Sequence, residues 1–161
     1  MRMSIIVRRA SQQDAAIVSA LNVDVQDLHA KALPWLFKTS GSGTFNAADA
    51  AELLAKENHL TFLCELNGQA VGYVVAEIQR KPDTPIKFAR DTIYIHHISV
   101  RPEYRKRGAG HALLNAVKSH GKSLGLTTLA LDTWAFNDDA LAFFQREGLV
   151  PYNIKLWAKI T

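Results

Sequence analysis

The stretch RPEYRKRGAG, residues 101–110, places four cationic side chains and two glycines directly before an apolar helical pattern. The first turn of a helix has unpaired N–H groups and a partial positive charge, so it binds phosphate readily. Gly108 and Gly110 would let this backbone approach a ligand without a Cβ in the way. Arg105 and Arg107 would add charge and forked hydrogen bonds to phosphate oxygens. These residue types, in this order, predict a phosphate-binding turn.

Two common phosphate motifs do not describe this turn. A Walker loop would read G-x-x-x-x-G-K-[ST], whereas here the basic residues precede the glycines. A dinucleotide fingerprint needs a third glycine at position 113, which is Leu113. The alternative interpretation is a solvated basic loop before a helix whose glycines are incidental. The order of strand, basic turn, Gly-x-Gly and amphipathic helix favours a ligand-binding turn over that alternative.

The rest of the chain predicts the elements that would hold this turn in place. Period-two patterns predict strands over 4–10, 59–66, 69–79, 91–100, 127–134 and 152–160. Helical periodicity and capping residues predict helices after Ser11, over 46–58, over 108–124 and over 137–148. Asn67-Gly68 predicts a hairpin between two of the strands, and the strand–helix–strand unit over 91–134 predicts a right-handed parallel crossover. The class is therefore α/β with a mixed, helix-covered sheet, in the order β-α-α-β-β-β-α-β-α-β.

Composition limits the classes of protein to consider. A chain of 161 residues predicts a single domain, 1–161, with a full core. No apolar run is long enough to span a membrane. The net charge of +4 is concentrated around residues 101–107, which suits a compact anion better than a nucleic acid. Cys64 is the only cysteine, which fits a reducing cytoplasm and excludes a zinc site of several cysteines.

Two motifs together resemble one protein family. RKRGAG, residues 105–110, is similar to the [QR]-x-x-G-x-[GA] signature of the GNAT family of N-acetyltransferases, which bind acetyl-CoA. Downstream, Asn137, Ala140 and Phe143 match the family's N-x-x-A-x-x-[FY] element. The resemblance covers about residues 92–150. It implies a mostly antiparallel mixed sheet with a splayed parallel strand pair and helices on both faces.

The resemblance also implies which residues would hold acetyl-CoA. The pyrophosphate would be bound by the backbone and charge of Arg105, Lys106, Arg107, Gly108, Ala109 and Gly110. The pantetheine arm would pair, like an added strand, with the backbone of Ile98, Ser99 and Val100. The thioester would lie in the gap between this strand and the strand at 128–133. Phe143 would pack near the cofactor, and Asn137 would either contact it or act only as a helix cap.

The strand at 91–100 carries the candidates for the general base of acetyl transfer. An amine attacks a thioester only as the neutral base, so the enzyme needs a proton acceptor. Strand alternation puts Tyr94 and His96 on one face and His97 on the other. His96 is the first candidate base, because its unperturbed pKa of about 6.5 suits the task and because its position resembles that of a histidine in arylalkylamine N-acetyltransferases. Glu77 and, less strongly, His97 are rival bases.

One position departs from the family pattern. Many members carry a tyrosine general acid right after the Phe143 position, but here the residue is Phe144, which has no proton to give. Tyr94, Tyr152 and Tyr73 are the remaining candidates for an acid. Direct transfer needs no metal, and no side chain is an obvious covalent nucleophile. His29, Trp35 and Phe37 would either line the acceptor site or pack a helix on the sheet.

The sequence thus predicts a cytoplasmic enzyme that moves an acetyl group from acetyl-CoA to a primary amine of a small molecule or a protein. A non-catalytic acyl-CoA sensor on the same fold is the alternative, and the missing tyrosine at Phe144 favours it. A nucleic-acid-binding module using residues 101–107 is the third and weakest interpretation. The strand expected at 152–160 could pair across a homodimer.

Overall fold

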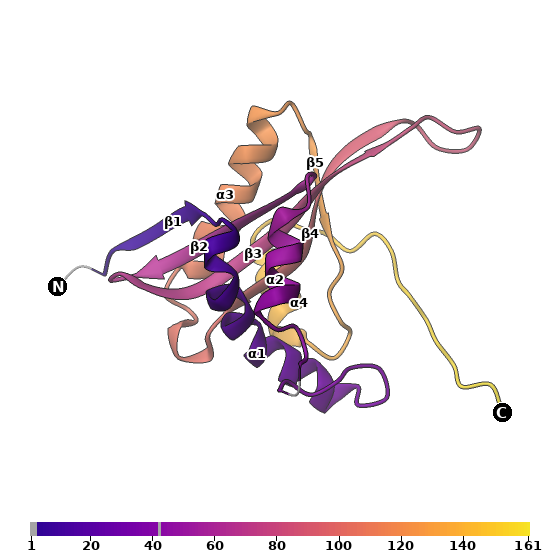
Figure 1. Cartoon of the computed structure of the whole chain (residues 1–161). Coiled ribbons are helices and arrows are strands. Elements are labelled where there is room, and N and C mark those ends of the chain that lie inside the picture. Colours follow the sequence, from indigo (N-terminus) through magenta and orange to yellow (C-terminus); the bar gives the residue numbers. More distant parts are fainter. Residues whose placement is uncertain (1–2, 42) are drawn as a thin grey trace.

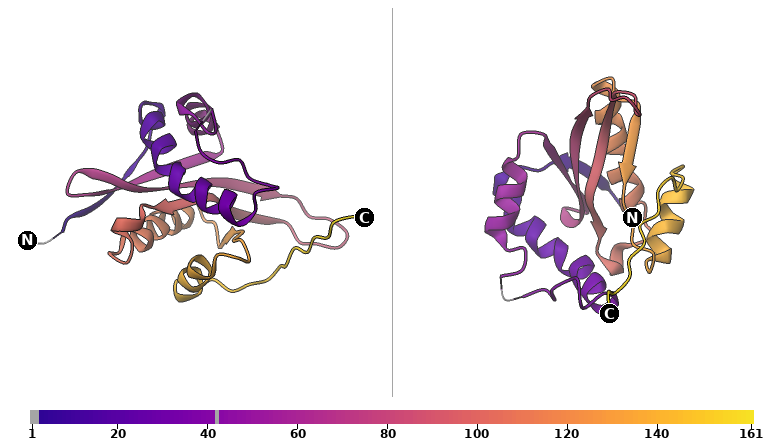
Figure 2. Two further views of the ribbon diagram at one scale, coloured as in Figure 1. Left: turned by 90° about the horizontal axis from the view of Figure 1, so that it is seen from below. Right: turned by 90° about the vertical axis from the view of Figure 1, so that its right-hand side faces the viewer.

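The computed structural model describes residues 3–41 and 43–161. One twisted sheet lies between two helical layers, with α1 and α2 on one face and α3 and α4 on the other (Figures 1 and 2). The strands are β1 Ile5–Arg9, β2 His59–Leu66, β3 Gln69–Lys81, β4 Arg90–Val100 and β5 Thr128–Leu131. The α-helices are α1 Ala15–Ala32, α2 Ala47–Ala55, α3 Ala109–Ser123 and α4 Asp138–Arg146. The predicted class, and every predicted element except the last strand, are confirmed.

The strands lie in the sheet in chain order, β1-β2-β3-β4-β5, and only the β4–β5 pair is parallel. The β2–β3 hairpin turns at Asn67 and Gly68, both with positive φ, as the Asn-Gly pair predicts. The chain crosses from β4 to β5 through α3, the kind of connection that a parallel pair requires.

Each face of the sheet has its own hydrophobic core. On the α3 face, the fully buried Leu113, Leu114 and Val117 pack against alternate residues of β2, β3 and β4. On the other face, Val18 and Leu21 of α1 pack, with other buried side chains, against β2 and β3. The sheet is therefore covered on both sides, and its side chains divide between the two cores by alternation.

A bulge in β4 changes the predicted alternation. Val75 pairs with His97 and the next residue, Ala76, pairs with Ile95, so His96 is an extra residue without a partner in β3. Ile95 before the bulge and Ile98 after it both pack against the α3 core. The prediction that His96 and His97 lie on opposite faces is therefore wrong.

The strand predicted over 152–160 is not formed. Residues 149–161 contain no helix or strand, and the order of elements ends at α4. The segment runs out from α4 to the C-terminal end of the chain (Figure 1, yellow). Its alternating pattern suits a strand, but a strand also needs a hydrogen-bonded neighbour, and this segment has none.

Among the described residues, no helix combines the length and the apolar character needed to cross a lipid bilayer.

We expect Leu113→Ala to lower the free energy of unfolding by about 2–5 kcal/mol, because the side chain is fully buried between α3 and the sheet. Leu124→Ala, which truncates a leucine that is 44% exposed at the end of α3, should cost about 1 kcal/mol or less. Urea unfolding of both variants measures the difference. Equal losses would show that α3 is not anchored through Leu113.

Candidate functional site

The basic turn enters α3 with an irregular backbone. Lys106 and Gly108 both have positive φ, 60° and 90°, and Gly108 is the N-cap of α3. The first amide to donate within the helix is that of Ala112, to the oxygen of Gly108 at 2.9 Å. The amides before it in the first turn are therefore available to a ligand. A compact anion would meet these donors at the positive end of the helix dipole.

Side chains hold this turn against the end of β4. Nε of Arg105 donates to the carbonyl oxygen of Val100 at 3.0 Å. The guanidinium of Arg107 lies over the ring of Tyr104, 5.7 Å from its centroid, and the Tyr104 hydroxyl donates to Gln69. The charges are therefore fixed near the helix start while remaining exposed to solvent.

The second glycine has a packing role as well. A Cβ added to Gly110 would lie 3.1 Å from Cζ of Phe143, so α3 and α4 approach closely at this point. Nδ1 of His111 in α3 lies 2.8 Å from Oε2 of Glu147, the C-cap of α4, which adds a hydrogen bond between the same two helices. Asn137 accepts a hydrogen bond from the amide of Ala140 at 3.1 Å, which is the cap role, one of the two roles expected for it. Phe143 thus lies beside the basic turn, as its predicted role requires.

The parallel pairing of β4 with β5 is short. It covers only Thr92–Ile95 opposite Thr128–Leu131, after which β5 ends. Within the described residues, His97 to Val100 pair only with β3, and the bulge residue His96 pairs with neither neighbouring strand. This leaves an open edge of backbone groups that leads directly to the basic turn, the geometry that an extended ligand would need to add as a strand. Ile98, Ser99 and Val100 all lie on it.

The three candidate catalytic side chains come together on the α1 face of the sheet, next to this edge. Nε2 of His96 lies 2.6 Å from Oε2 of Glu77, and the ring of Tyr94 lies 4.9 Å from the ring of His96. Hydrogen bonds from Gln79 and His96 lower the pKa of Glu77, so it is an anion at neutral pH. Burial, together with a hydrogen bond to Asp132, raises the pKa of Tyr94, so its hydroxyl keeps its proton.

Two residues of this cluster were missed by sequence reasoning. His59 stacks on His96 with 5.2 Å between ring centroids, and Asp132 accepts from Tyr94. His59 is the first residue of β2 and pairs with Glu77, while Asp132 directly follows β5. Neither residue belongs to a local sequence motif. Only the register between strands brings them to the site, so no signal in the sequence marks them.

The same cluster has the composition of a metal site. Ligand atoms of His59, Glu77 and His96 lie within 4.8 Å of one another, and two histidines with a carboxylate form a common zinc ligand set. The two imidazoles, however, are stacked and parallel within 4°, whereas ligands of one ion direct their lone pairs at a common point. The arrangement fits a hydrogen-bonded acid–base pair better than a metal site.

His97 is unsuited to be the base. Burial, with a smaller contribution from nearby histidines, lowers the pKa of His97 to about 4. Its Nδ1 lies 3.2 Å from the hydroxyl of the buried Tyr73. A neutral, enclosed imidazole with this partner is part of the core, so the structure favours His96 over His97.

Aromatic side chains gather beyond the end of β5. His29 lies 4.9 Å from Phe37, 5.7 Å from Phe136 and 6.1 Å from Trp134 between ring centroids. The cluster thus joins the end of α1 to the loop between β5 and α4. Trp35, also predicted for this region, is 58% exposed and contacts Trp157.

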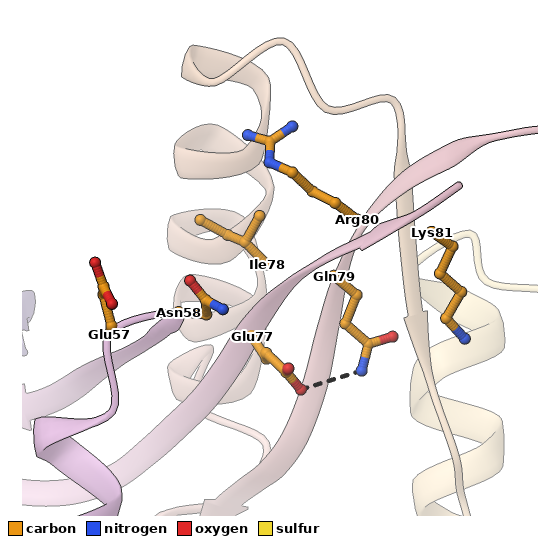
Figure 3. Close-up of a pocket in the computed structure, with 7 residues that line it drawn as sticks. All are labelled: Glu57, Asn58, Glu77, Ile78, Gln79, Arg80 and Lys81. Atoms are coloured by element: carbon orange, nitrogen blue, oxygen red, sulfur yellow. Dashed lines mark hydrogen bonds between the residues drawn. The ribbon is translucent and has the colours of Figure 1, made fainter. Parts of the chain in front are cut away.

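A hollow of about 510 Å³ borders the cluster on the side away from the basic turn (Figure 3). It forms where β3 continues beyond the first residue of β2, and its lining includes Glu57, Asn58, Glu77, Arg80 and Lys81. The carboxylate of Glu77, bonded to Gln79 in Figure 3, is therefore reachable from this hollow.

The chain is similar in sequence to known acetyltransferases. The model of the acetyltransferase (GNAT) family matches residues 19–149. An uncharacterized N-acetyltransferase of Methanocaldococcus jannaschii is 31% identical over 67% of this chain, although the match spans only 47% of that protein. The ribosomal protein bS18-alanine N-acetyltransferase of Escherichia coli is 26% identical over 78% of this chain and 71% of its own length.

Solved structures show the same fold. A mutant form of the BH1408 protein from Bacillus halodurans superposes with a TM-score of 0.90, at 25% identity, over 97% of this chain and 99% of its own. An aminoglycoside N-acetyltransferase in complex with CoA superposes with a TM-score of 0.73, at 20% identity, over 99% of this chain and 97% of its own.

The half-buried His97 predicts a pH dependence of stability. Its pKa of about 4 lies below the ordinary 6.5, so the unfolded chain binds a proton first as pH falls, and stability is lost between about pH 6.5 and 4. This group should account for up to about 3 kcal/mol of that loss. We expect His97→Gln to lose less stability than the wild type between pH 7 and 4.5 in urea titrations, whereas His120→Gln should follow the wild type. Identical slopes for wild type and His97→Gln would contradict the assignment.

Proposed function

The chain belongs to the acetyltransferase (GNAT) family, and on that premise we propose that it transfers the acetyl group of acetyl-CoA to a primary amine. The observation that carries this proposal is the open edge of β4, which runs from the His96–Glu77 pair at one end to the basic turn at the other. We further propose that residues 1–161 form one catalytic domain that works in a reducing cytoplasm, since Cys64 is single and buried.

In this proposal, CoA binds along the edge of β4. The diphosphate accepts hydrogen bonds from the amides of residues 107–110, with Arg105 and Lys106 supplying charge. The pantetheine arm pairs with the backbone of residues 98–100 and brings the thioester to the gap beyond the end of β5. Support comes from the helix start at Gly108 and from the edge of β4 that β5 leaves unpaired over residues 98–100. Phe143 packs beside the cofactor from α4, where Asn137 serves as cap.

The chemical step is direct attack of the amine on the thioester carbonyl. His96 takes one proton from the amine nitrogen, directly or through a water molecule, as the C–N bond forms. A backbone N–H of β4 near Ile98 stabilises the developing oxyanion. The C–S bond then breaks, which releases CoA and leaves the amide product.

Glu77 acts on His96 rather than on the substrate. With its carboxylate 2.6 Å from Nε2 of His96, it would hold the imidazole in the tautomer that carries a proton on Nε2, so that Nδ1 is free to accept one. Glu77 would also stabilise the imidazolium once it has formed. This arrangement makes His96 the base and Glu77 its positioning partner.

Tyr94 is the proposed source of a proton for the departing thiolate. Phe144 is 7% exposed and belongs to the packing of α4, so it has no part in the chemistry. The hydroxyl of Tyr94 keeps its proton at neutral pH and lies on the same face as His96. It therefore takes the place of the missing tyrosine in α4.

The acceptor would approach past the aromatic cluster of His29, Phe37, Trp134 and Phe136. Aromatic faces attract cations and apolar groups, so they suit an amine attached to an apolar or aromatic body. Relatives act on very different amines, as the names of the ribosomal protein-alanine and aminoglycoside enzymes state. We therefore propose the acceptor only as a primary amine on a small molecule or a protein.

The second candidate function is an acyl-CoA sensor without turnover. Phe144 is the observation that favours it, because the usual acid is absent. The two functions differ in one measurement: an enzyme releases free thiol from acetyl-CoA in the presence of an amine panel, whereas a sensor only binds it.

We expect Gly108→Val to raise the Kd for CoA by about tenfold or more, because the loss of one well-made hydrogen bond to an anion corresponds to about that factor. Valine strains a residue that has a φ of 90° and distorts the helix start. Gly125→Val is the matched control, since Gly125 has a φ of 76° at the other end of α3. Isothermal titration measures both affinities.

An equal loss of CoA affinity in both valine variants would mean that strain, and not the turn itself, is responsible. An unchanged affinity in Gly108→Val would contradict the placement of the diphosphate.

We expect His96→Ala to lower kcat by about 10²–10⁴-fold at neutral pH, the usual contribution of a general base, with little change in the Kd for CoA. Glu77→Gln should lower kcat less, because the imidazole remains. His120→Ala, on α3 away from the cluster, serves as the control. Thiol release with an amine that is turned over measures all three.

Wild-type activity in His96→Ala would contradict the assignment of the base. A loss of both kcat and CoA affinity would show instead that His96 supports the cofactor site.

A further inference from the structure

His96, the proposed base, lies at the least constrained point of β4. It is the bulge residue, so it pairs with neither neighbouring strand, and its side chain is 33% exposed. Its hydrogen bond to Glu77 joins one ring nitrogen, Nε2, to one carboxylate oxygen. A single bond of this kind leaves the imidazole free to turn about the bond axis, and χ2 of histidine is itself a soft torsion. A second contact is therefore needed to fix the plane of the ring and the direction of its Nδ1 lone pair.

His59 makes a contact that fixes this plane. Its imidazole is parallel to that of His96 within 4°, with 5.2 Å between the ring centroids, which is the geometry of an offset stack. Tyr94 also contacts the ring of His96, but the two ring planes are inclined by 65°. A flat face that packs parallel to a ring opposes any tilt of that ring. His59 thus restrains the motion that the hydrogen bond to Glu77 leaves free.

The backbone around His59 is fixed, unlike that of the bulge. His59 is the first residue of β2 and pairs with Glu77 in β3. Its amide donates to the carbonyl oxygen of Lys56 at 3.1 Å, and the amide of Ile78 donates to the carbonyl oxygen of Asn58 at 2.9 Å. The stack therefore connects the unpaired bulge of β4 to the regular pairing of β2 with β3.

The charge state of His59 suits this contact. Burial lowers the pKa of His59 below its usual 6.5, although the charge of Glu77 acts in the opposite direction. The ring is therefore neutral at neutral pH and does not repel the positive charge that His96 carries once it has taken a proton. Nδ1 of His59 is buried and has no hydrogen-bond partner within residues 3–41 and 43–161. Because an unsatisfied buried nitrogen is destabilising, the contact with His96 explains the position of this ring better than any hydrogen bond of its own.

We propose that His59 is a positioning residue for acetyl transfer, which holds the plane of the His96 imidazole so that Nδ1 points at the amine that it deprotonates. Glu77 fixes one nitrogen of the base, and His59 fixes the plane of its ring. This inference rests on the proposed role of His96 as the base. Because a displacement of about 1 Å can cost about 100-fold in rate, loss of the stack should appear in kcat and not in the binding of CoA.

Two apolar substitutions separate the plane of the ring from the space that it fills. His59→Leu fills the site with a side chain that is not flat, and should lower kcat by about 10–100-fold with little change in KM or in the Kd for CoA. His59→Phe restores a flat ring and should recover most of this loss. His120→Leu, on α3, is the control and should leave kcat unchanged. Thiol release with an amine that the wild type turns over measures kcat, and circular dichroism checks the fold.

Two results would overturn the proposal. The first is a wild-type kcat in His59→Leu. The second is an equal loss in His59→Leu and His59→Phe, because the imidazole itself, and not its plane, would then be what the reaction needs. If His59→Leu does not fold, His59→Thr serves as the non-planar variant, and the same two results decide.

A double-mutant cycle tests whether His59 acts through His96. In the His96→Ala background, His59→Leu should leave the residual rate unchanged, because no imidazole remains to be positioned. A further loss of about tenfold would show that His59 acts on the reaction by another route, which would contradict the proposal.

Relaxation of the ring C–H groups of His96, measured by nuclear magnetic resonance, gives a readout that needs no turnover. The order parameter of this ring should fall in His59→Leu and recover in His59→Phe. An unchanged order parameter in His59→Leu would overturn the positioning role even in an active enzyme. The predicted fall, in a protein that releases no thiol with any amine, would support the positioning of His96 and contradict the proposed acetyl transfer instead.

Discussion

The candidate site depends on one constraint, which is that the parallel pairing between β4 and β5 ends early. Only four residues of each strand pair, because β5 stops at Leu131 while β4 continues to Val100. The backbone of residues 96–100 therefore keeps a row of unpaired groups on one side, inside a fold that is otherwise covered on both faces. Such a row is a surface to which an extended ligand with its own amides can add as a strand.

The bulge at His96 adds the chemistry to this opening. The extra residue places His96 and His97 on the same face, but in different environments. His97 is enclosed by Tyr73 and the core, whereas His96 reaches Glu77 and remains accessible. One irregularity in β4 thus separates a structural histidine from a candidate base, which is a common use of bulges near functional sites. The same strand then ends at Val100, where Arg105 connects it to the basic turn.

Local signals predicted most of the fold, including the basic turn and the helix start at which we propose that CoA binds. Asn67-Gly68, the cap at Asn137 and the order of residues 101–110 each depend on neighbours in the chain, and each was predicted correctly as an element. The face of His97, the presence of His59 and Asp132 in the cluster, and the missing last strand depend on register and pairing between distant segments. A period-two pattern predicts a strand, but it does not reveal a bulge that switches the faces on which the following side chains lie. It also does not show whether a partner strand exists for residues 152–160.

The central claim is that the open edge of β4 is the binding site of acetyl-CoA. A crystal structure of the protein with CoA tests it most directly. We predict a diphosphate on the amides of residues 107–110, a pantetheine arm along residues 98–100, and a thiol within reach of His96. CoA bound elsewhere, for example in the hollow beside Arg80 and Lys81, would contradict the account.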